Sequence, residues 1–312
     1  MNRILLTGAG FSKNWGGFLA REVWERLLVH RHVRTNEALR QCLLRNAPDF
    51  ESALGESHSV ESDGQVLEQA LVDVYLEQDR AENGATSEYS GSFNQSQFAW
   101  FVDSFKAPDR TAILFTLNQD VLLERRYHEL IHGPGIGELQ FKSGAAHLSD
   151  EHSRIVDLQQ TPSIQKGHVN YVKMHGSFNW RDSHGGSLVV AGNDKPEQLR
   201  TRFPILQHYL TLFRDACMQP NTLLFVAGYS FRDGHINDVI AEGVALGLRL
   251  VVADTAPPEV LFLDRKEYTN KLHHADIWKG LGGYCSQPLG RLFGDHPLGS
   301  KILQDCLWIE AG

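Results

Sequence analysis

Cysteine is scarce in this 312-residue chain, and its few cysteines are far apart. The four residues are Cys42, Cys217, Cys285 and Cys306, so no CxxC pair is present. This spacing excludes the zinc ribbons and dithiol redox motifs that are built on such pairs. We expect the cysteines to be buried thiols.

Long apolar runs and an excess of positive charge are also missing. No stretch approaches the roughly 18 uninterrupted apolar residues of a membrane-spanning helix, and the apolar run in MNRILLTGAG is too short for a signal peptide. The formal net charge of −8 disfavours a protein that holds nucleic acid by its phosphates. We therefore expect a cytoplasmic globular protein that binds neither a membrane nor, directly, nucleic acid.

Short β-rich apolar runs recur along the chain, each ending in a polar or glycine turn. They are residues 3–8, 111–118, 168–176, 221–230 and 248–255. Such runs are typical of strands that are covered on both faces, as in a parallel sheet. Helical patterns lie between them, at 19–28, 196–218 and 233–247, the last with Asp233 as its predicted N-cap. The alternation predicts an α/β fold with a Rossmann-like, doubly wound parallel sheet.

The interval between the first two predicted strands is long and helical. Residues 64–80 form an amphipathic pattern, and residues 81–97 are predicted to form a polar surface loop. We predict a helical subdomain inserted at about residues 18–106 of a single domain, 1–312. A second irregular stretch, 133–154, is predicted to form loops beside the sheet.

The first predicted strand ends in the sequence TGAGFS. At the carboxyl end of a parallel strand, Gly8 and Gly10 let the backbone turn sharply and let a phosphate approach the amide N–H groups of the following helix. The dinucleotide-binding fingerprint G-x-G-x-x-G would need glycine at position 13, where the chain has Lys13. By itself the turn indicates either a phosphate site or a tight structural turn.

Polar motifs follow the other predicted strands, at the edge where open α/β sheets bind ligands. TLNQD carries Asn118 and Asp120, KMHGS carries His175, and GYSFRDGHIN spans 228–237. Together with GAGFS, these motifs resemble the sirtuin fold, and more closely its bacterial sirtuin-like branch, which destroys NAD⁺ in antiphage defence. The resemblance runs in the same order across residues 4–255.

Two family features are missing from the chain. Deacetylating sirtuins carry a zinc module of two CxxC pairs and a Pro-Asp-Phe-Arg segment soon after the glycine turn. This chain has neither, and KNWGGFLAREVW stands where that segment would be. The resemblance therefore implies NAD⁺ as a substrate that is cleaved, without zinc, rather than protein deacylation.

The resemblance assigns catalytic roles to three residues. Asn118 would hold the attacking water, Asp120 would fix the nicotinamide ribose or carboxamide region, and His175 would contact the ribose hydroxyls as a base or orienting group. Each residue also has a structural alternative. Asn118 is also typical of a turn, Asp120 of a helix cap, and His175 of a buried hydrogen-bonding histidine.

The resemblance also assigns residues that bind NAD⁺. The pyrophosphate would lie against the glycine turn, with further contacts after the fourth strand, and the adenosine ribose would meet the end of the fifth. The residues are Gly8, Ala9, Gly10, Ser12, Gly228, Ser230 and Asp254. Ser12 and Asp254 have the alternative role of capping the helices that follow them.

A competing motif is HELIH at 128–132, which matches the zinc metalloprotease signature H-E-x-x-H. His128 and His132 would be ligands, Glu129 the base, and Glu138 a third ligand. A chain with 15 histidines produces this loose pattern by chance, and the predicted helix follows directly from TLNQD. We therefore interpret the motif as a solvated helix end and expect no metal.

These observations lead to one preferred function and an alternative. The preferred function is hydrolysis of NAD⁺ to nicotinamide and ADP-ribose by an antiphage defence effector. Control would come from homo-oligomerisation or from a separate protein, for which the family offers a HerA-type ATPase or a short Argonaute. Trp278 and Trp308 would lie in an interface or in the core. The alternative is a sensor that binds NAD⁺ or an ADP-ribose derivative without cleaving it.

Overall fold

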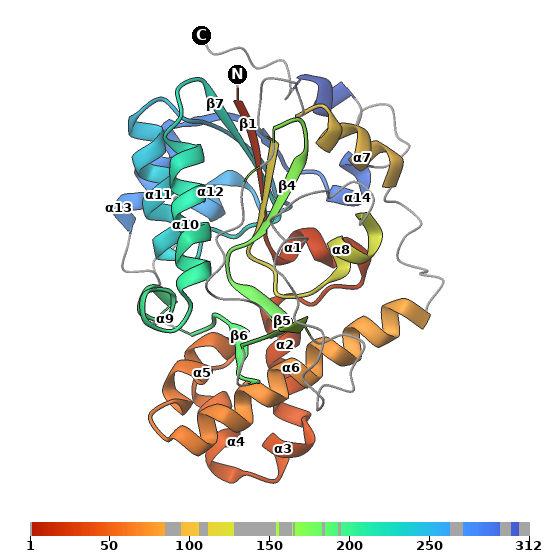
Figure 1. Ribbon diagram of the computed structural model, residues 1–312, viewed down its shortest axis with the longest axis vertical. Coiled ribbons are helices and arrows are strands. Elements are labelled where there is room, and N and C mark those ends of the chain that lie inside the picture. Colours follow the sequence, from red (N-terminus) through yellow and green to blue (C-terminus); the bar gives the residue numbers. More distant parts are fainter. Residues whose placement is uncertain are drawn as a thin grey trace.

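A six-stranded parallel sheet forms the centre of the computed structural model (Figure 1). Its order is β4 (Val169–Lys173), β2 (Ala112–Thr116), β1 (Asn2–Thr7), β7 (Thr222–Ala227), β8 (Arg249–Ala253) and β9 (Leu281–Cys285), and all neighbours are parallel. Taken along the chain, this is the doubly wound order 3-2-1-4-5-6. The predicted fold class is therefore confirmed.

The structure describes residues 2–84, 95–105, 112–127, 154–155, 164, 166–182, 185–192, 195–262, 271–293 and 301–305. Short helices accompany the sheet at several of its turns. They are α1 (Ala9–Ser12), the 3-10 helix η1 (Lys13–Trp15), α8 (Leu122–Tyr127), α12 (Pro258–Phe262) and α14 (Leu289–Leu292). No helix in the described ranges is long and apolar enough to cross a membrane.

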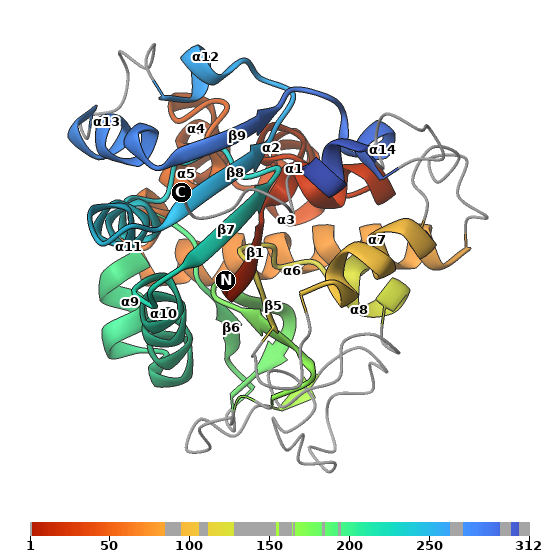
Figure 2. The same ribbon diagram turned by 90° about the horizontal axis from the view of Figure 1, so that it is seen from above.

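Helices cover both faces of the sheet, as Figure 2 shows from above. On one face lie α10 (Pro204–Cys217), α11 (Gly234–Ala245) and α13 (Lys271–Lys279), and on the other lie α7 (Gln95–Asp103), α8 and α14. Ile4 and Leu6 of β1 belong to the first apolar core and Leu5 to the second, because successive side chains point to opposite faces of a strand. The uninterrupted apolar runs of the sequence are explained by this double coverage.

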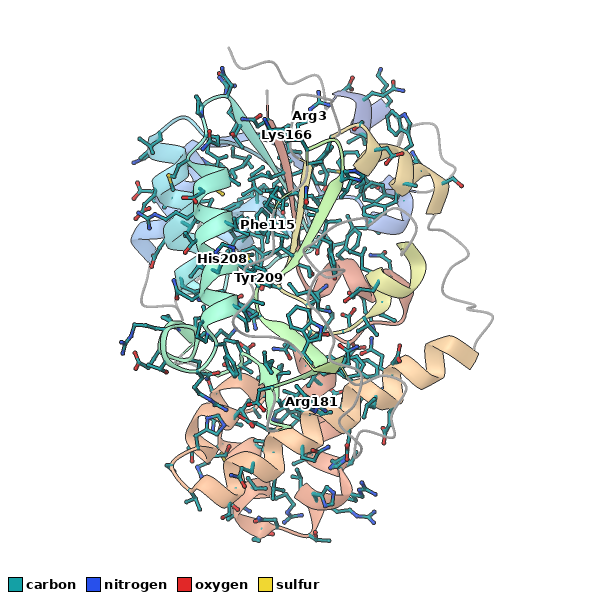
Figure 3. The ribbon with its side chains drawn as sticks, in the orientation of Figure 1. Arg3, Phe115, Lys166, Arg181, His208 and Tyr209 are labelled. Carbon is teal, nitrogen blue, oxygen red and sulfur yellow. The ribbon has the colours of Figure 1, made fainter. Side chains whose placement is uncertain are left out.

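Aromatic side chains fill the core between β2 and α10. The ring centroids of Phe115 and Phe213 are 5.0 Å apart, and Tyr209 of the same helix is fully buried (Figure 3). Helix α10 begins with Pro204 at its first position, and a separate helix, α9 (Lys195–Thr201), precedes it. The single helix predicted at 196–218 is therefore wrong, because Phe203 leaves the helical conformation before the proline.

Most of the chain between β1 and β2 forms helices that pack on one another, at the bottom of Figure 1. They are α2 (Ala20–Val29), α3 (Arg31–Arg34), α4 (Glu37–Arg45), α5 (Phe50–Ser57) and α6 (Glu61–Gly84). Asn36 and Asp49 cap α4 and α5 with their side chains. Helix α7 packs instead against the sheet. A subdomain with the limits 18–106 stays a prediction.

The sequence did not predict two parts of the sheet structure. The edge strand β9 has the sequence LGGYC, in which two glycines weaken the strand pattern. The second sheet contains β3 (Arg154–Ile155), β5 (Gly176–Arg181) and β6 (Ser187–Val189). Only Met174 and His175 separate β4 from β5, so no turn signal divides the two strands in the sequence. The strand predicted at 168–176 therefore accounts for β4 and not for β5.

Candidate active site

The glycine turns after β1 and β7 lie against each other at the point where the strand order reverses. The Gly8 N–H donates to the carbonyl of Ala227 at 3.1 Å, and the Gly10 N–H donates to the carbonyl of Gly228 at 3.0 Å. A Cβ atom at Gly8 would lie 2.7 Å from the Gly228 oxygen, and one at Gly228 would lie 2.3 Å from the Phe11 nitrogen. Gly228 also has a φ of +62°. These glycines allow two backbone segments to meet.

This packing bears on the predicted phosphate cradle. The amides of Gly8 and Gly10 already donate within the protein, so neither is available to a phosphate. Ala9 is exposed at the turn, and the Ser12 hydroxyl is buried behind it. The pyrophosphate contact of this turn stays a prediction, with Ala9 and Ser12 as its remaining donors.

Asn118 joins the end of β2 to the first glycine turn. Its Nδ2 donates to the carbonyl of Gly8 at 2.9 Å and to the Ser12 hydroxyl at 2.8 Å, and its N–H donates to Thr116 Oγ1 at 3.1 Å. Among the described residues, its Oδ1 has no hydrogen-bond partner. The two bonds to Nδ2 fix the plane of the amide, so this half-buried oxygen has a fixed direction.

Asp120 has the structural role of a helix cap. Its Oδ1 accepts from the Leu122 N–H at 3.0 Å, at the start of α8, and the side chain is buried. Its backbone carbonyl accepts from the buried Lys173 ammonium, which also pairs with Glu124 at 2.8 Å. The structural alternative therefore explains Asp120, and its contact with NAD⁺ stays a prediction.

His175 lies in the turn between β4 and β5, with 3% of its surface exposed. Its Nε2 is 3.1 Å from Nε2 of His235, near the start of α11. Burial lowers the pKa of His175 well below its ordinary value, and the Lys195 ammonium lowers it further. Burial also lowers the pKa of His235 to about 4. Both rings are therefore neutral at pH 7, so one nitrogen donates a hydrogen bond and the other accepts it.

A group of three charges, with the buried Lys195 at its centre, lies beside the two histidines. Lys195, at the start of α9, contacts Asp233 and lies 2.8 Å from a carboxylate oxygen of Glu51 in α5. Burial opposes the charged form of Lys195, but the two carboxylates outweigh it and raise its pKa. Burial acts to raise the pKa of Asp233, but the neighbouring groups, Lys195 foremost, together lower that pKa. The group connects three helices that are far apart in the chain.

Asp233 corrects one detail of the sequence prediction. It occupies the N-cap position of α11, but its side chain makes no cap hydrogen bond, because it pairs with Lys195 instead. Its N–H donates to the Tyr229 hydroxyl at 3.1 Å. The sequence motif GYSFRDGHIN contains both Asp233 and His235. Their contacts with Lys195 and His175, which only the folded structure shows, place them at the candidate site.

The two remaining candidates on this edge are Asp254 and Ser230. Oδ1 of Asp254 accepts from the Ala256 N–H at 2.8 Å, and its own N–H donates to the Cys285 carbonyl at 3.1 Å. This bond to Ala256 shapes the turn before α12, which begins at Pro258, and is not the helix cap that the structural alternative predicts. Ser230 is half-buried after β7. Contacts of either residue with NAD⁺ stay predictions.

The structure thus brings the candidates together in two groups. Asn118, Ser12 and the two glycine turns form one group through direct contacts. His175 joins the other group, with Asp233 and His235, whose ligand atoms all lie within 4.8 Å of one another. Among the described residues, this is a set with the composition of a metal site. The residues of HELIH, His128, Glu129 and His132, and also Glu138, lie outside the described residues.

Comparison with known proteins places the chain in a family. The model of the SIR2-like domain matches residues 112–282, which is more than half of the chain. A solved structure from a study of the mechanism and regulation of Sir2 enzymes is similar, with 11% sequence identity and a TM-score of 0.44. The match covers 98% of this chain and 92% of that chain. No curated protein sequence matches. The family match includes the turns that carry Asn118, His175 and Asp233, and the chain belongs to the SIR2-like domain family.

Proposed function

We propose that this protein binds NAD⁺ and hydrolyses the bond between nicotinamide and ribose, releasing nicotinamide and ADP-ribose. Membership of the SIR2-like family, a family of NAD-dependent enzymes, supports NAD⁺ as the substrate. The observation that carries the proposal is the fixed amide of Asn118, held by Gly8 and Ser12 at the reversal point of the strand order. Ligands of doubly wound sheets bind at this point.

The reaction needs little acid catalysis. Nicotinamide leaves a cationic pyridinium as a neutral molecule, so the enzyme must chiefly position a water and stabilise an oxocarbenium-like transition state. In our proposal, Oδ1 of Asn118 accepts a hydrogen bond from that water. The neutral ring of His175 accepts a hydrogen bond from a ribose hydroxyl or takes a proton from the water.

NAD⁺ would lie along the carboxyl edge of the sheet. In the proposed placement, the pyrophosphate lies at the turns that contain Ala9, Ser12, Gly228 and Ser230. The adenosine ribose lies at the end of β8, near Asp254. Asp120 contributes by holding the start of α8, through its bond to the Leu122 N–H, next to the nicotinamide end.

The biological role is a separate part of the proposal. We propose a defence effector that depletes NAD⁺ and is controlled by self-assembly or by a partner such as a HerA-type ATPase or a short Argonaute. The lack of CxxC pairs in the sequence supports hydrolysis over zinc-dependent deacylation. This role rests on the motifs that resemble the bacterial sirtuin-like branch.

Release of nicotinamide from NAD⁺ by the purified protein tests the activity. We expect release that is insensitive to EDTA and is abolished by His175→Ala and by Asn118→Ala, with thermal unfolding showing that the variants fold. Parent-level release by folded Asn118→Ala would contradict the proposed site. Stabilisation by NAD⁺ without release would instead indicate a sensor, and loss with EDTA would indicate a metalloenzyme.

A further inference from the structure

His175, Asp233 and His235 form a group that the proposed hydrolysis uses only in part, with His175 buried and the other two half-buried. His175 comes from the turn between β4 and β5, while Asp233 and His235 come from the start of α11. A hydrogen bond holds the backbone of each of these two segments, the β4–β5 turn and the start of α11. The His175 carbonyl accepts from the Val190 N–H at 3.0 Å, and the Asp233 N–H donates to the Tyr229 hydroxyl at 3.1 Å.

The spacing of the two histidine nitrogens suits a shared ion. Two imidazole nitrogens bound tetrahedrally to one Zn²⁺, at about 2.0–2.1 Å each, lie about 3.3–3.4 Å apart. The two Nε2 atoms here are 3.1 Å apart. Asp233 supplies a carboxylate oxygen within 4.8 Å of both nitrogens.

The ion cluster beside the histidines contains more carboxylates than ammonium groups. Lys195 contacts two carboxylates, those of Asp233 and Glu51, so two negative groups surround one positive group. Lys195 binds Oδ1 of Asp233, and Oδ2 has no hydrogen-bond partner among the described residues.

We propose that His175, Asp233 and His235 bind one divalent transition-metal ion of the Zn²⁺ type, with a fourth position open. Two imidazoles and one carboxylate form a donor set that suits Zn²⁺, Fe²⁺ and Co²⁺ and disfavours Mg²⁺ and Ca²⁺. Asp233 and His235 are half-buried, whereas His175 is buried.

The ion has a consequence for activity that rests on the proposed function. Nε2 of His175 cannot accept a proton or a hydrogen bond from the substrate while it binds a metal ion. Zn²⁺ should therefore inhibit nicotinamide release, and EDTA should restore it.

Binding itself is tested without NAD⁺, so it stands or falls independently of the hydrolase proposal. Protein stripped with EDTA is titrated with Co²⁺, which is followed by its visible absorption and by calorimetry. We expect one Co²⁺ per chain, displaced by Zn²⁺. His235→Ala and Asp233→Asn should each weaken binding at least about tenfold. Asp233→Asn keeps a side-chain oxygen for Lys195 and covers the case in which His235→Ala does not fold.

Two control variants identify the site. His58 is a half-buried histidine 3.1 Å from a carboxylate oxygen of Glu68, outside the group, and His58→Ala should keep the parent affinity. His132→Ala, in the HELIH motif, should also keep it. No stoichiometric binding, an unchanged affinity in His235→Ala and Asp233→Asn, or a loss confined to His132→Ala would each overturn the proposal.

Discussion

At the scale of single residues, several polar side chains at the strand ends have structural hydrogen bonds of their own. Asp120 caps α8, Asp254 shapes the turn before α12, and Asn118 holds the first glycine turn. Sequence reasoning named a structural role for each, together with a catalytic role for Asn118 and Asp120 and an NAD⁺-binding role for Asp254. The structural roles are hydrogen bonds to backbone atoms of the protein itself. The other roles require contacts with bound NAD⁺.

Asn118 combines the two roles, and substitution should separate them. Asn118→Ala removes both bonds from Nδ2 and the directed oxygen, so we expect nicotinamide release to fall by about 100-fold or more, because the water is no longer positioned. Ser12→Ala removes one of the two bonds and keeps the oxygen. It should retain most of the activity, measured in the same assay at saturating NAD⁺. Equal losses in the two variants would contradict a role for Oδ1.

Gly228 provides a test of the contact between the two turns. Gly228→Ala combines a left-handed φ of +62° with a clash against the Phe11 nitrogen, so it should lower the free energy of unfolding by about 2–5 kcal/mol. Gly247 has a φ of +99° with open space where a Cβ would lie. Gly247→Ala should cost only about 1–2 kcal/mol. Urea unfolding measures both, and equal costs would show that the turns do not pack tightly.

At the scale of elements, the sequence predicted the strands that are covered on both faces. β1, β2, β7 and β8 carry uninterrupted apolar runs, and β4 has three apolar residues among five, so local pattern was enough to find them. β9 contains two glycines, and β5 follows β4 after two residues, so neither has an independent pattern. The ion pair between Lys195 and Glu51 joins α9 to α5. No local sequence pattern predicts an ion pair between residues so far apart in the chain.

Lys195 should be the main electrostatic link among α5, α9 and α11. Lys195→Met leaves Asp233 and Glu51 without their shared cation, so we expect a loss of about 3–5 kcal/mol in the free energy of unfolding. The triple variant with Asp233→Asn and Glu51→Gln removes the unpaired charges and should recover part of the loss. No recovery would show that packing of the lysine stem, rather than charge, stabilises the contact.

The junction of α2 and α3 should make stability depend on pH. Burial lowers the pKa of His30, although Asp73 opposes this, so the unfolded chain takes up a proton at a higher pH than the folded one. The contribution of neutral His30 is present above about pH 6.5 and is lost as the pH falls. His30→Leu should show a smaller drop in urea midpoint between pH 7 and pH 5 than the parent. An identical drop would assign the dependence to other groups.

At the scale of the whole molecule, the sequence led to the family because its motifs occur in the order of the strands. The resemblance to sirtuins is confirmed by the family match over residues 112–282, while the antiphage role and the partners stay predictions. The contact between His175 and His235 could not be predicted from the sequence and is seen only in the structure. Their contact joins segments 60 residues apart, and its geometry depends on how α11 lies beside the sheet.

The cysteines report on the folded state of the whole molecule. Cys42, Cys217 and Cys285 are buried, and burial raises the pKa of the Cys42 and Cys217 thiols. A Cys306→Ser variant should therefore show no rapid reaction with a thiol reagent such as Ellman's reagent until urea unfolds it. Rapid native labelling of this variant would reveal local opening at one of the three sites.

The packing of the Gly8 turn on the Gly228 turn has a consequence for protein synthesis. β1 leaves the ribosome before β7, yet the backbone that encloses its turn is translated some two hundred residues later, and His235 follows after that. A nascent chain that stops before β7 therefore has no assembled site, although it already contains Asn118 and His175. The translating cell is thus exposed to a complete site only when most of the sheet has been made.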